Sequence, residues 1–249
     1  MQPCVEMLGF SVYSGDFRKI VPASFTDLKR PVLVTTFNAH AYIVAKRDRF
    51  FYDALQRSDI LLPDGSGAVL AARLLSKRPI RKIAMYDCFL FQLERLEREG
   101  GSCFFLGASQ KTLDEIAARL KKDYPGIRAG FYSPPYKETF SEDESREMIK
   151  AVNDFAPEVL FVGMTAPKQE KWAFRYRDRL ETKMIFAIGA NFDFFAGTIS
   201  RPPEVFIRFH LEWLGRLLNE PRRMWRRVFI SLPLFVIEVF AVKFGFKKI

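Results

Sequence analysis

A single carboxylate occupies the position in this chain best suited to catalysis. Asp64 follows a short apolar run, residues 59–62, and precedes a run rich in Ala and Leu, residues 68–75. The first run predicts a buried strand and the second a helix, so Asp64 lies where a strand turns into a helix. Ligands of open α/β sheets bind at the carboxyl ends of the strands, which makes Asp64 a candidate catalytic residue. The competing interpretation is a helix cap within a Pro-Asp-Gly turn.

Two further polar residues are expected near this carboxylate. The β-branched run 31–36 is typical of a central parallel strand, and Thr36 and Asn38 lie at its end, before a helix predicted over residues 39–55. If the two strands are parallel neighbours, Thr36, Asn38 and Asp64 meet at one edge of the sheet. Each could be a helix cap, but three polar residues at one edge favour a site.

Two other segments suit a phosphate group. A turn containing Gly107 precedes a helix that extends to about residue 122, and such a turn exposes backbone N–H groups that favour anions. A plain strand-to-helix turn explains the same residues equally well. Lys168 and Gln169 lie near the start of another predicted helix, where they could hold a diphosphate.

The C-terminal part of the chain is basic and aromatic. The formal net charge is +10, and residues 201–249 hold ten Lys and Arg against four Glu, together with nine Phe and Trp. Such a segment suits nucleic acid, an anionic membrane surface or a phosphorylated ligand. Arg223, Arg226 and Arg227 have the i, i+3, i+4 spacing that places residues on one face of a helix.

Residues 228–242 are mostly apolar but include Pro233 and Glu238. This run is shorter than the roughly 20 apolar residues that a membrane-spanning helix requires. We therefore expect an interfacial segment that lies on a membrane, flanked by Lys243, Lys247 and Lys248. Packing against the protein's own core or against a dimer partner is the alternative.

Strands and helices are predicted to alternate over residues 30–195. The expected fold is therefore α/β, a Rossmann-like and mostly parallel sheet with helices on both faces, plus a helical C-terminal membrane-associating appendage. We assign residues 1–197 to the catalytic domain and residues 198–249 to the appendage. A weak strand or hairpin is expected over residues 5–13, and a helix over residues 204–218.

The sequence lacks the motifs that mark several common kinds of metal, catalytic and nucleotide-binding site. Three cysteines without a C-x-x-C pair fit a reducing compartment, no signal peptide is recognisable, and only two histidines are present. A D-x-D pair, a G-x-S-x-G elbow and a P-loop are missing, and Leu70 stands where a dinucleotide motif needs its third Gly. We expect no metal and no cofactor. A nucleic-acid-binding protein and a nicotinamide-dependent enzyme are two functions that these residues leave open.

An ordered set of motifs resembles the WecG/TagA/CpsF glycosyltransferases of bacterial surface-polysaccharide and teichoic-acid synthesis. The matching stretches, in family order, are Thr36-Phe37-Asn38, Leu62-Pro63-Asp64-Gly65, Phe105-Leu106-Gly107, Ala166-Pro167-Lys168-Gln169-Glu170, Gly189-Ala190-Asn191-Phe192-Asp193-Phe194 through Gly197, Arg201-Pro202-Pro203, Glu212-Trp213 with Arg216, and Glu220-Pro221 with Arg223 and Arg226. Each motif is weak alone, but the ordered set extends over most of the chain and is specific.

The resemblance implies an inverting, metal-independent transferase that acts from the inner face of the cytoplasmic membrane. It would move N-acetylmannosamine, or a related hexose or uronic acid, from a UDP-sugar to a polyprenyl-diphosphate-linked sugar. No nucleic acid is expected as a partner, and a homo-oligomer is compatible with the sequence. Thr165, Ala166 and Met85 depart from residues common in the family, which leaves the sugar open.

The resemblance also implies roles for single residues. Asp64 would be the base, with Thr36 and Asn38 beside it in the catalytic site. The residues expected to bind substrate are Gly65, Gly107, Lys168, Gln169, Glu170, Asn191, Asp193, Arg216, Arg223 and Arg226. Of these, the three arginines are expected to reach a diphosphate.

Overall fold

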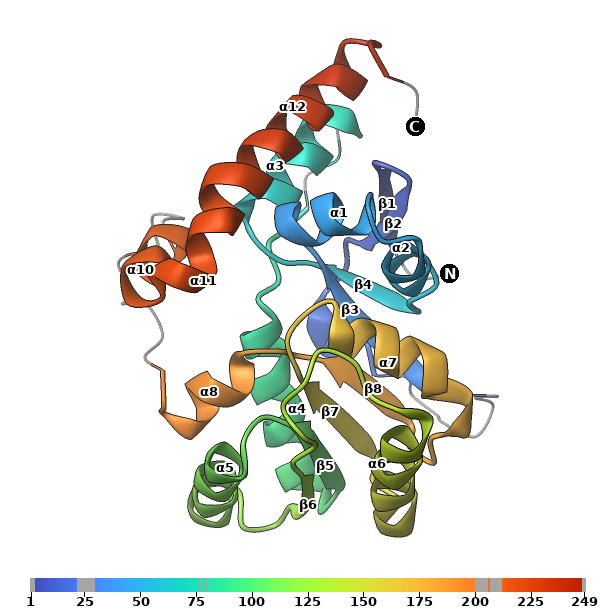
Figure 1. Ribbon diagram of the computed structural model, residues 1–249, viewed down its shortest axis with the longest axis vertical. Coiled ribbons are helices and arrows are strands. Elements are labelled where there is room, and N and C mark those ends of the chain that lie inside the picture. Colours follow the sequence, from blue (N-terminus) through green and yellow to red (C-terminus); the bar gives the residue numbers. More distant parts are fainter. Residues whose placement is uncertain are drawn as a thin grey trace.

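A computed structural model describes residues 3–21, 30–76, 78, 80–199, 206 and 212–247, without the side chains of Glu212 and Arg223. Six parallel strands form one sheet in the order β4-β3-β8-β7-β5-β6 (Figure 1). In that order they are β4 (Ile60–Pro63), β3 (Val32–Phe37), β8 (Met184–Ala187), β7 (Val159–Gly163), β5 (Ser102–Gly107) and β6 (Arg128–Tyr132). A separate antiparallel hairpin consists of β1 (Cys4–Met7) and β2 (Phe10–Tyr13). The predicted parallel sheet and N-terminal hairpin are confirmed.

Helices connect the strands and continue beyond the last one. They are α1 (Ala39–Ala45), α2 (Arg49–Gln56), α3 (Ser66–Leu75), α4 (Met85–Glu99), α5 (Gln110–Asp123), α6 (Glu142–Phe155), α7 (Lys168–Tyr176), α8 (Asn191–Ala196), α10 (Glu212–Asn219), α11 (Pro221–Arg226) and α12 (Leu232–Lys243). Two short 3₁₀ turns, η1 (Phe17–Lys19) and η2 (Arg177–Arg179), and one π-helical turn, η3 (Arg227–Ser231), complete the set. Of the helix predicted over residues 204–218, only the part from residue 212 belongs to a described helix, and the motif at residues 201–203 lies outside the described residues.

The strands are apolar on both faces because helices cover both faces of the sheet. In β3, Val32 and Val34 belong to a core formed with α4 and α5, whereas Leu33 belongs to a core formed with α6 and α7. Successive side chains of a strand point to opposite faces, so a strand buried on both sides must be apolar throughout. This explains why the apolar runs of the sequence predict the strands well.

The helix predicted over residues 39–55 is wrong in one respect, because the structure divides it into α1 and α2. Asp48 has extended backbone geometry, with φ of −127°, and its side chain accepts a 3.0 Å hydrogen bond from the backbone N–H of Phe51. It is therefore the N-cap of α2. The carboxylate also lies 2.8 Å from the ammonium group of Lys171 on α7, which ties this break to the sheet-covering helices. The apolar periodicity continues across the break and so conceals it.

Helix α12 packs against α1 and α3, as Figure 1 shows. Phe235 and Val239 are buried on its inner side, and the ring of Phe235 lies 5.5 Å from that of Tyr42 and 6.3 Å from that of Phe37. Packing on the protein's own core, the alternative interpretation of this segment, is thus confirmed for one side of the helix. None of the described helices is both long enough and apolar enough to span a membrane.

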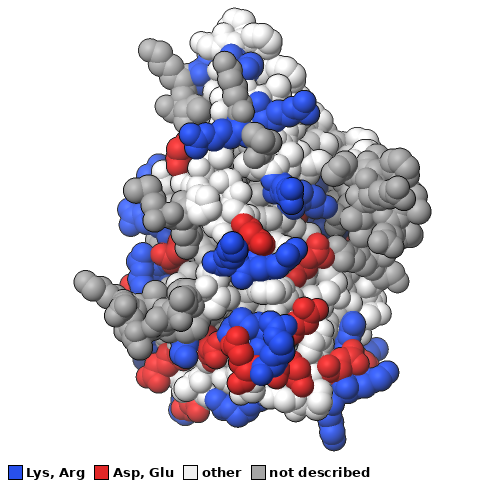
Figure 2. Space-filling model, turned by 180° about the vertical axis from the view of Figure 1, so that it is seen from behind, with Lys and Arg blue, Asp and Glu red and all other residues white. Residues whose placement is uncertain are grey.

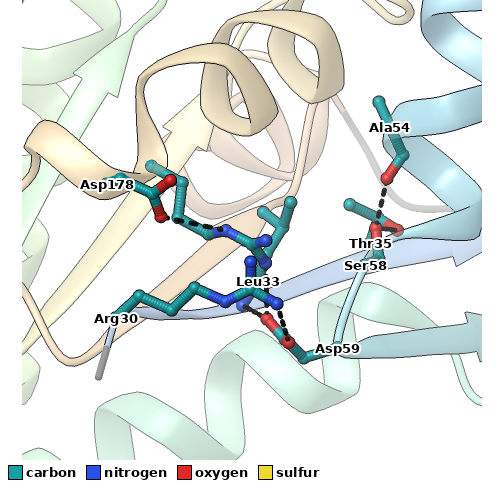
Figure 3. A network of polar contacts seen from close by, with 8 residues as sticks. Arg30, Leu33, Thr35, Ala54, Ser58, Asp59 and Asp178 are labelled. Atoms are coloured by element: carbon teal, nitrogen blue, oxygen red, sulfur yellow. Dashed lines mark hydrogen bonds and ion pairs between the residues drawn. The ribbon is translucent and has the colours of Figure 1, made fainter. Parts of the chain in front are cut away.

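An ionic network centred on the buried Arg177 and on Asp59 fixes the amino-terminal end of the sheet, opposite the edge where Asp64 lies (Figure 3). One carboxylate oxygen of Asp59 accepts a 2.8 Å hydrogen bond from the backbone N–H of Leu33 and a 2.7 Å bond from the Arg177 guanidinium. The Arg177 side chain is only 3% exposed, so this ion pair is largely desolvated on the arginine side. Asp59 thereby links the starts of β3 and β4 to the end of α7.

Candidate active site

Thr36, Asn38 and Asp64 meet at the carboxyl edge of the sheet. Strands β3 and β4 are parallel neighbours, with Thr36 opposite Leu62. Beyond the strand ends, the backbone N–H of Asp64 donates a 2.9 Å hydrogen bond to the carbonyl oxygen of Phe37. All three polar residues line one depression, which we call the central cleft. The expected meeting of these residues is confirmed.

Asn38 is the N-cap residue of the helix that follows it, whereas Asp64 lies one residue before the N-cap of its helix. The Asn38 side-chain oxygen accepts a 2.9 Å hydrogen bond from the backbone N–H of Ala41, so Asn38 is the N-cap of α1. The N-cap position of α3 belongs to Gly65, whose φ of +91° favours glycine and which has no side chain to cap the helix. The half-buried Asp64 carboxylate lies in the cleft instead.

Helix α7 contributes two buried polar side chains to the central cleft. The Gln169 side-chain oxygen accepts a 3.2 Å hydrogen bond from the backbone N–H of Met164, and its amide nitrogen donates a 2.8 Å bond to Oε1 of Glu170. These two bonds fix the orientation of the Gln169 amide. The other oxygen of Glu170, Oε2, is buried without a hydrogen-bond partner among the described residues. Burial raises the pKa of Glu170 to about 7, although the Gln169 hydrogen bond and the charge of Arg227 oppose the rise.

Two further depressions adjoin the central cleft. The first, which we call the basic cleft, shares Asn38, His40, Asp64, Arg216 and Arg227 with it; the basic cleft is also lined by Gly65, Lys82, Trp213, Met224, Val228 and Leu232. The second, which we call the β5 pocket, continues from Met164 and Gly189 to Gly107, Ser109, Lys168 and Asp193. The three spaces together run along the carboxyl edge of the sheet, where α/β proteins bind their ligands.

Positive charge in this region comes from side chains. Lys82, Arg216 and Arg227 line the basic cleft around Asp64. The guanidinium of Arg216 lies 5.4 Å from the ring centroid of Phe194, and its buried Nε has no hydrogen-bond partner within the described part of the chain. The described residues include no group of three or more His, Cys, Asp or Glu side chains placed to hold a metal ion. A phosphate bound here would be met by guanidinium and ammonium groups.

Comparison with known proteins assigns the chain to a family. A model of the glycosyl transferase WecG/TagA/CpsF family matches residues 5–249. This protein is a member of that family. The resemblance inferred from the ordered motifs is thereby confirmed, and the match extends over nearly the whole chain.

Three named relatives share most of their length with this family member. One from Bacillus spizizenii is 33% identical over 87% of this chain and 81% of its own, and one from Bacillus subtilis is 31% identical over 86% and 81%. One from Staphylococcus aureus is 25% identical over 87% and 83%. Each is named N-acetylglucosaminyldiphosphoundecaprenol N-acetyl-beta-D-mannosaminyltransferase.

The structure brings most of the predicted site residues of this family member together. Besides the residues that meet at the edge of the sheet, the central cleft holds Gln169, Glu170, Asn191 and Arg216. Gly65 lines the basic cleft, and Gly107, Lys168 and Asp193 line the β5 pocket.

Two predicted arginines are not placed in these spaces. Arg226 is exposed, with its guanidinium 5.3 Å from the ring centroid of Trp225, and it lines none of the three. The side chain of Arg223 lies outside the described residues.

Gly107 has a structural explanation that needs no ligand. Its φ is +125°, and an added Cβ would lie 2.4 Å from the carbonyl oxygen of Gly163 on the adjacent strand β7. Only glycine permits this close approach of the two strands. The following helix is capped by Ser109, whose hydroxyl accepts a 3.2 Å hydrogen bond from the backbone N–H of Thr112. The turn therefore fits the plain strand-to-helix interpretation, although it also lines the β5 pocket.

Sequence reasoning missed three residues that line the site: His40, Lys82 and Arg227. His40 Nδ1 lies 2.8 Å from the hydroxyl of Ser231 in the π-helical turn, so it joins α1 to the C-terminal segment. Burial, assisted by the charge of Arg227, lowers the pKa of His40 to about 4 and keeps the ring neutral. The only available signal was proximity to Asn38 for His40 and the arginine spacing for Arg227.

Proposed function

We propose that this protein is an inverting, metal-independent transferase. It moves N-acetylmannosamine, or a related hexose or uronic acid, from a UDP-sugar to GlcNAc linked through a diphosphate to a polyprenol. The names of the Bacillus and Staphylococcus relatives support the sugar and the acceptor. The single observation that carries the chemistry is the position of Asp64, whose carboxylate lies where the central and basic clefts meet among basic side chains.

Asp64 acts as the general base of this reaction. Its carboxylate takes the proton of the acceptor hydroxyl while the hydroxyl oxygen attacks the anomeric carbon of the donor. The bond between that carbon and the UDP oxygen breaks, and UDP departs with the electron pair. One displacement from the opposite side inverts the anomeric configuration. General-base assistance of this kind is worth about 10²–10⁴-fold in rate.

The departing UDP gains negative charge, which the basic side chains stabilise. Arg216 lines the central cleft as well as the basic cleft, and its guanidinium can donate two parallel hydrogen bonds to a phosphate there. The fixed amide of Gln169 and the hydroxyl of Thr36 supply neutral polar groups in the central cleft. We assign the nucleotide to the β5 pocket, with Gly107, Lys168 and Asp193, and the acceptor to the basic cleft.

The outward side of the C-terminal segment brings the enzyme to its lipid-linked acceptor. Phe229, Ile230, Ile237, Phe240 and Phe244 are exposed large apolar side chains on η3, α12 and the residue after it. Lys243 and Lys247 lie at the same end of the chain, and cations beside an apolar helix face favour an anionic membrane surface. Because Leu232 of α12 lines the basic cleft, a membrane bound by this face would lie near the acceptor site. The inner face of the cytoplasmic membrane is where we place the protein.

Family membership favours this function over nucleic-acid binding and over nicotinamide chemistry. Figure 2 shows Lys and Arg interspersed with Asp and Glu over the back of the molecule, rather than a single basic surface. The face drawn there is therefore not the continuously basic surface expected of a duplex-binding protein.

A donor panel tests the proposal. Purified protein is incubated with single UDP-sugars and a short-chain GlcNAc-diphospholipid acceptor, with EDTA present, while UDP release and the anomeric configuration of the product are recorded. We expect acceptor-dependent release from UDP-N-acetylmannosamine or a close relative, with inversion. Retention of configuration, or release that EDTA abolishes, would contradict the mechanism, and lack of transfer from every donor would contradict the function.

A further inference from the structure

We propose that Arg227, and not its neighbour Arg226, is the C-terminal arginine that binds a substrate diphosphate beside Asp64. The inference rests on the proposed transferase function and adds a residue to its site. Arg227 lines both the central and the basic cleft, where Asn38, His40 and Asp64 are also found. Arg226 is exposed and lies over the ring of Trp225.

The burial of neighbouring residues explains why Arg226 and Arg227 lie on different sides of the C-terminal segment. Met224, Val228 and Ser231 are buried and mark the inner side of the C-terminal segment. Arg227 follows Met224 by three residues, and residues three apart on a helix lie on the same side. Trp225 and Phe229, in contrast, are exposed, and Arg226 lies on their side. The sequence spacing suggested one shared arginine face, but the structure separates Arg226 from Arg227.

The π-helical turn η3 adds a second reason. Helix α11 ends at Arg226, and the backbone N–H of Leu232 then bonds to the carbonyl oxygen of Arg227, five residues back. Single π-turns inside helices are frequent at functional sites. At the end of this turn the Ser231 hydroxyl contacts His40 on α1, the helix that begins just after Asn38. The turn that begins with Arg227 is thereby attached to the helix at the catalytic edge.

Charge in the two clefts also suits a diphosphate. Burial is the main cause of the shifted pKa values of Glu170 and His40, and the nearby charge of Arg227 lowers the pKa of both. His40 is neutral at pH 7, and burial keeps much of Glu170 protonated. The positive charges of the clefts, on Lys82, Arg216 and Arg227, then outnumber the negative charges. Such an excess suits the binding of an anion that carries several charges.

The reaction offers two diphosphates of the same chemistry, that of UDP and that of the polyprenyl-linked acceptor. Kinetic constants separate them. Loss of the donor diphosphate contact raises the KM for the UDP-sugar and weakens UDP binding. Loss of the acceptor contact raises the KM for the lipid-linked acceptor and leaves UDP binding unchanged.

The test compares four variants of the full chain: Arg227→Gln, Arg227→Lys, Arg226→Gln and Arg222→Gln. Arg222 is an exposed arginine of the same helical segment and serves as the matched control. Steady-state kinetics with the short-chain acceptor and calorimetric UDP binding are measured, with thermal unfolding as a check of folding. We expect Arg227→Gln to lower kcat/KM by about 10–100-fold, the usual effect of losing a hydrogen bond to a charged group. Arg227→Lys should retain more activity, and the other two variants should stay within about threefold of wild type.

The outcomes separate this assignment from the proposed function. An increase in either KM on changing Arg227 supports the assignment and identifies the diphosphate. Activity of Arg227→Gln equal to that of Arg222→Gln, or an equal loss in Arg226→Gln, would overturn the assignment while the transferase function stands. Wild-type protein that transfers no sugar would refute the proposed function and this inference together.

Discussion

The backbone N–H of Asp64 donates a 2.9 Å hydrogen bond to the carbonyl oxygen of Phe37, the residue before Asn38. This bond continues the pairing of β3 and β4 past the ends of the strands, so the side chains of Asn38 and Asp64 lie at one edge. Their roles then differ. Asn38 caps α1, whereas the cap position of α3 is occupied by Gly65, which leaves the Asp64 carboxylate in the cleft.

Glu170 should make stability depend on pH. Its pKa is about 7 in the folded protein because of burial, against an ordinary value of 4.5. Between these two values the folded state keeps a proton that the unfolded chain has lost, so wild-type stability falls as the pH rises through this window. Glu170→Gln does not titrate and keeps an acceptor for Gln169. We expect its free energy of unfolding, relative to wild type, to increase by up to about 3 kcal/mol between pH 4.5 and 8.

Urea unfolding of both proteins across this pH range measures the difference directly. A difference that stays constant with pH would show that Glu170 does not titrate with a raised pKa. Glu115→Gln, an exposed glutamate on α5, is the control and should show no such trend.

Asp59 should matter for stability and not for chemistry. Asp59→Ala leaves the buried guanidinium of Arg177 without its main counter-charge, which costs about 3–5 kcal/mol in comparable buried pairs. The exposed pair of Asp143 and Arg146 provides the control, since Asp143→Ala should cost less than about 1 kcal/mol. Chemical denaturation tests both. An Asp59→Ala variant as stable as Asp143→Ala would contradict the role of the network in Figure 3.

The sequence predicted the strands well and the approach of distant segments poorly. Buried strands such as β7, Val159–Gly163, are apolar throughout and are recognisable without the fold. Helix α1 ends at Ala45 and Asp48 caps α2 within an unbroken apolar pattern, so the boundary between the two helices was concealed.

The residues of the candidate site also fall into a group that the sequence predicted and a group that it did not. Thr36, Asn38 and Asp64 follow strands, and their meeting required only that the strands be parallel neighbours. His40 and Arg227 approach each other because a segment about 190 residues later packs on α1, and Arg227 turns inward where a π-turn interrupts the helix. Helical spacing alone cannot predict this, because it assumes a regular helix.

The exposed side of α12 should bind membranes. Ile237 is 63% exposed and Phe240 43% exposed, and a charged residue at either position opposes insertion into the lipid interface. We expect Ile237→Glu combined with Phe240→Glu to lower co-sedimentation with vesicles of anionic phospholipid by at least about 10-fold, with little change in thermal stability. Ala118→Glu combined with Lys111→Gln, two exposed positions of α5, makes the same change in net charge away from α12 and is the control. Unchanged co-sedimentation of the α12 variant would exclude this face as the membrane contact.

Asp64→Asn tests the central claim most directly, because it removes the base and preserves the shape of the side chain. Single-turnover transfer and UDP binding are measured for wild type and variant with the same donor and short-chain acceptor. General-base catalysis predicts a loss of about 10²–10⁴-fold in the rate of transfer with UDP affinity retained. Equal rates of transfer by the two proteins would contradict the assignment of Asp64 as the base.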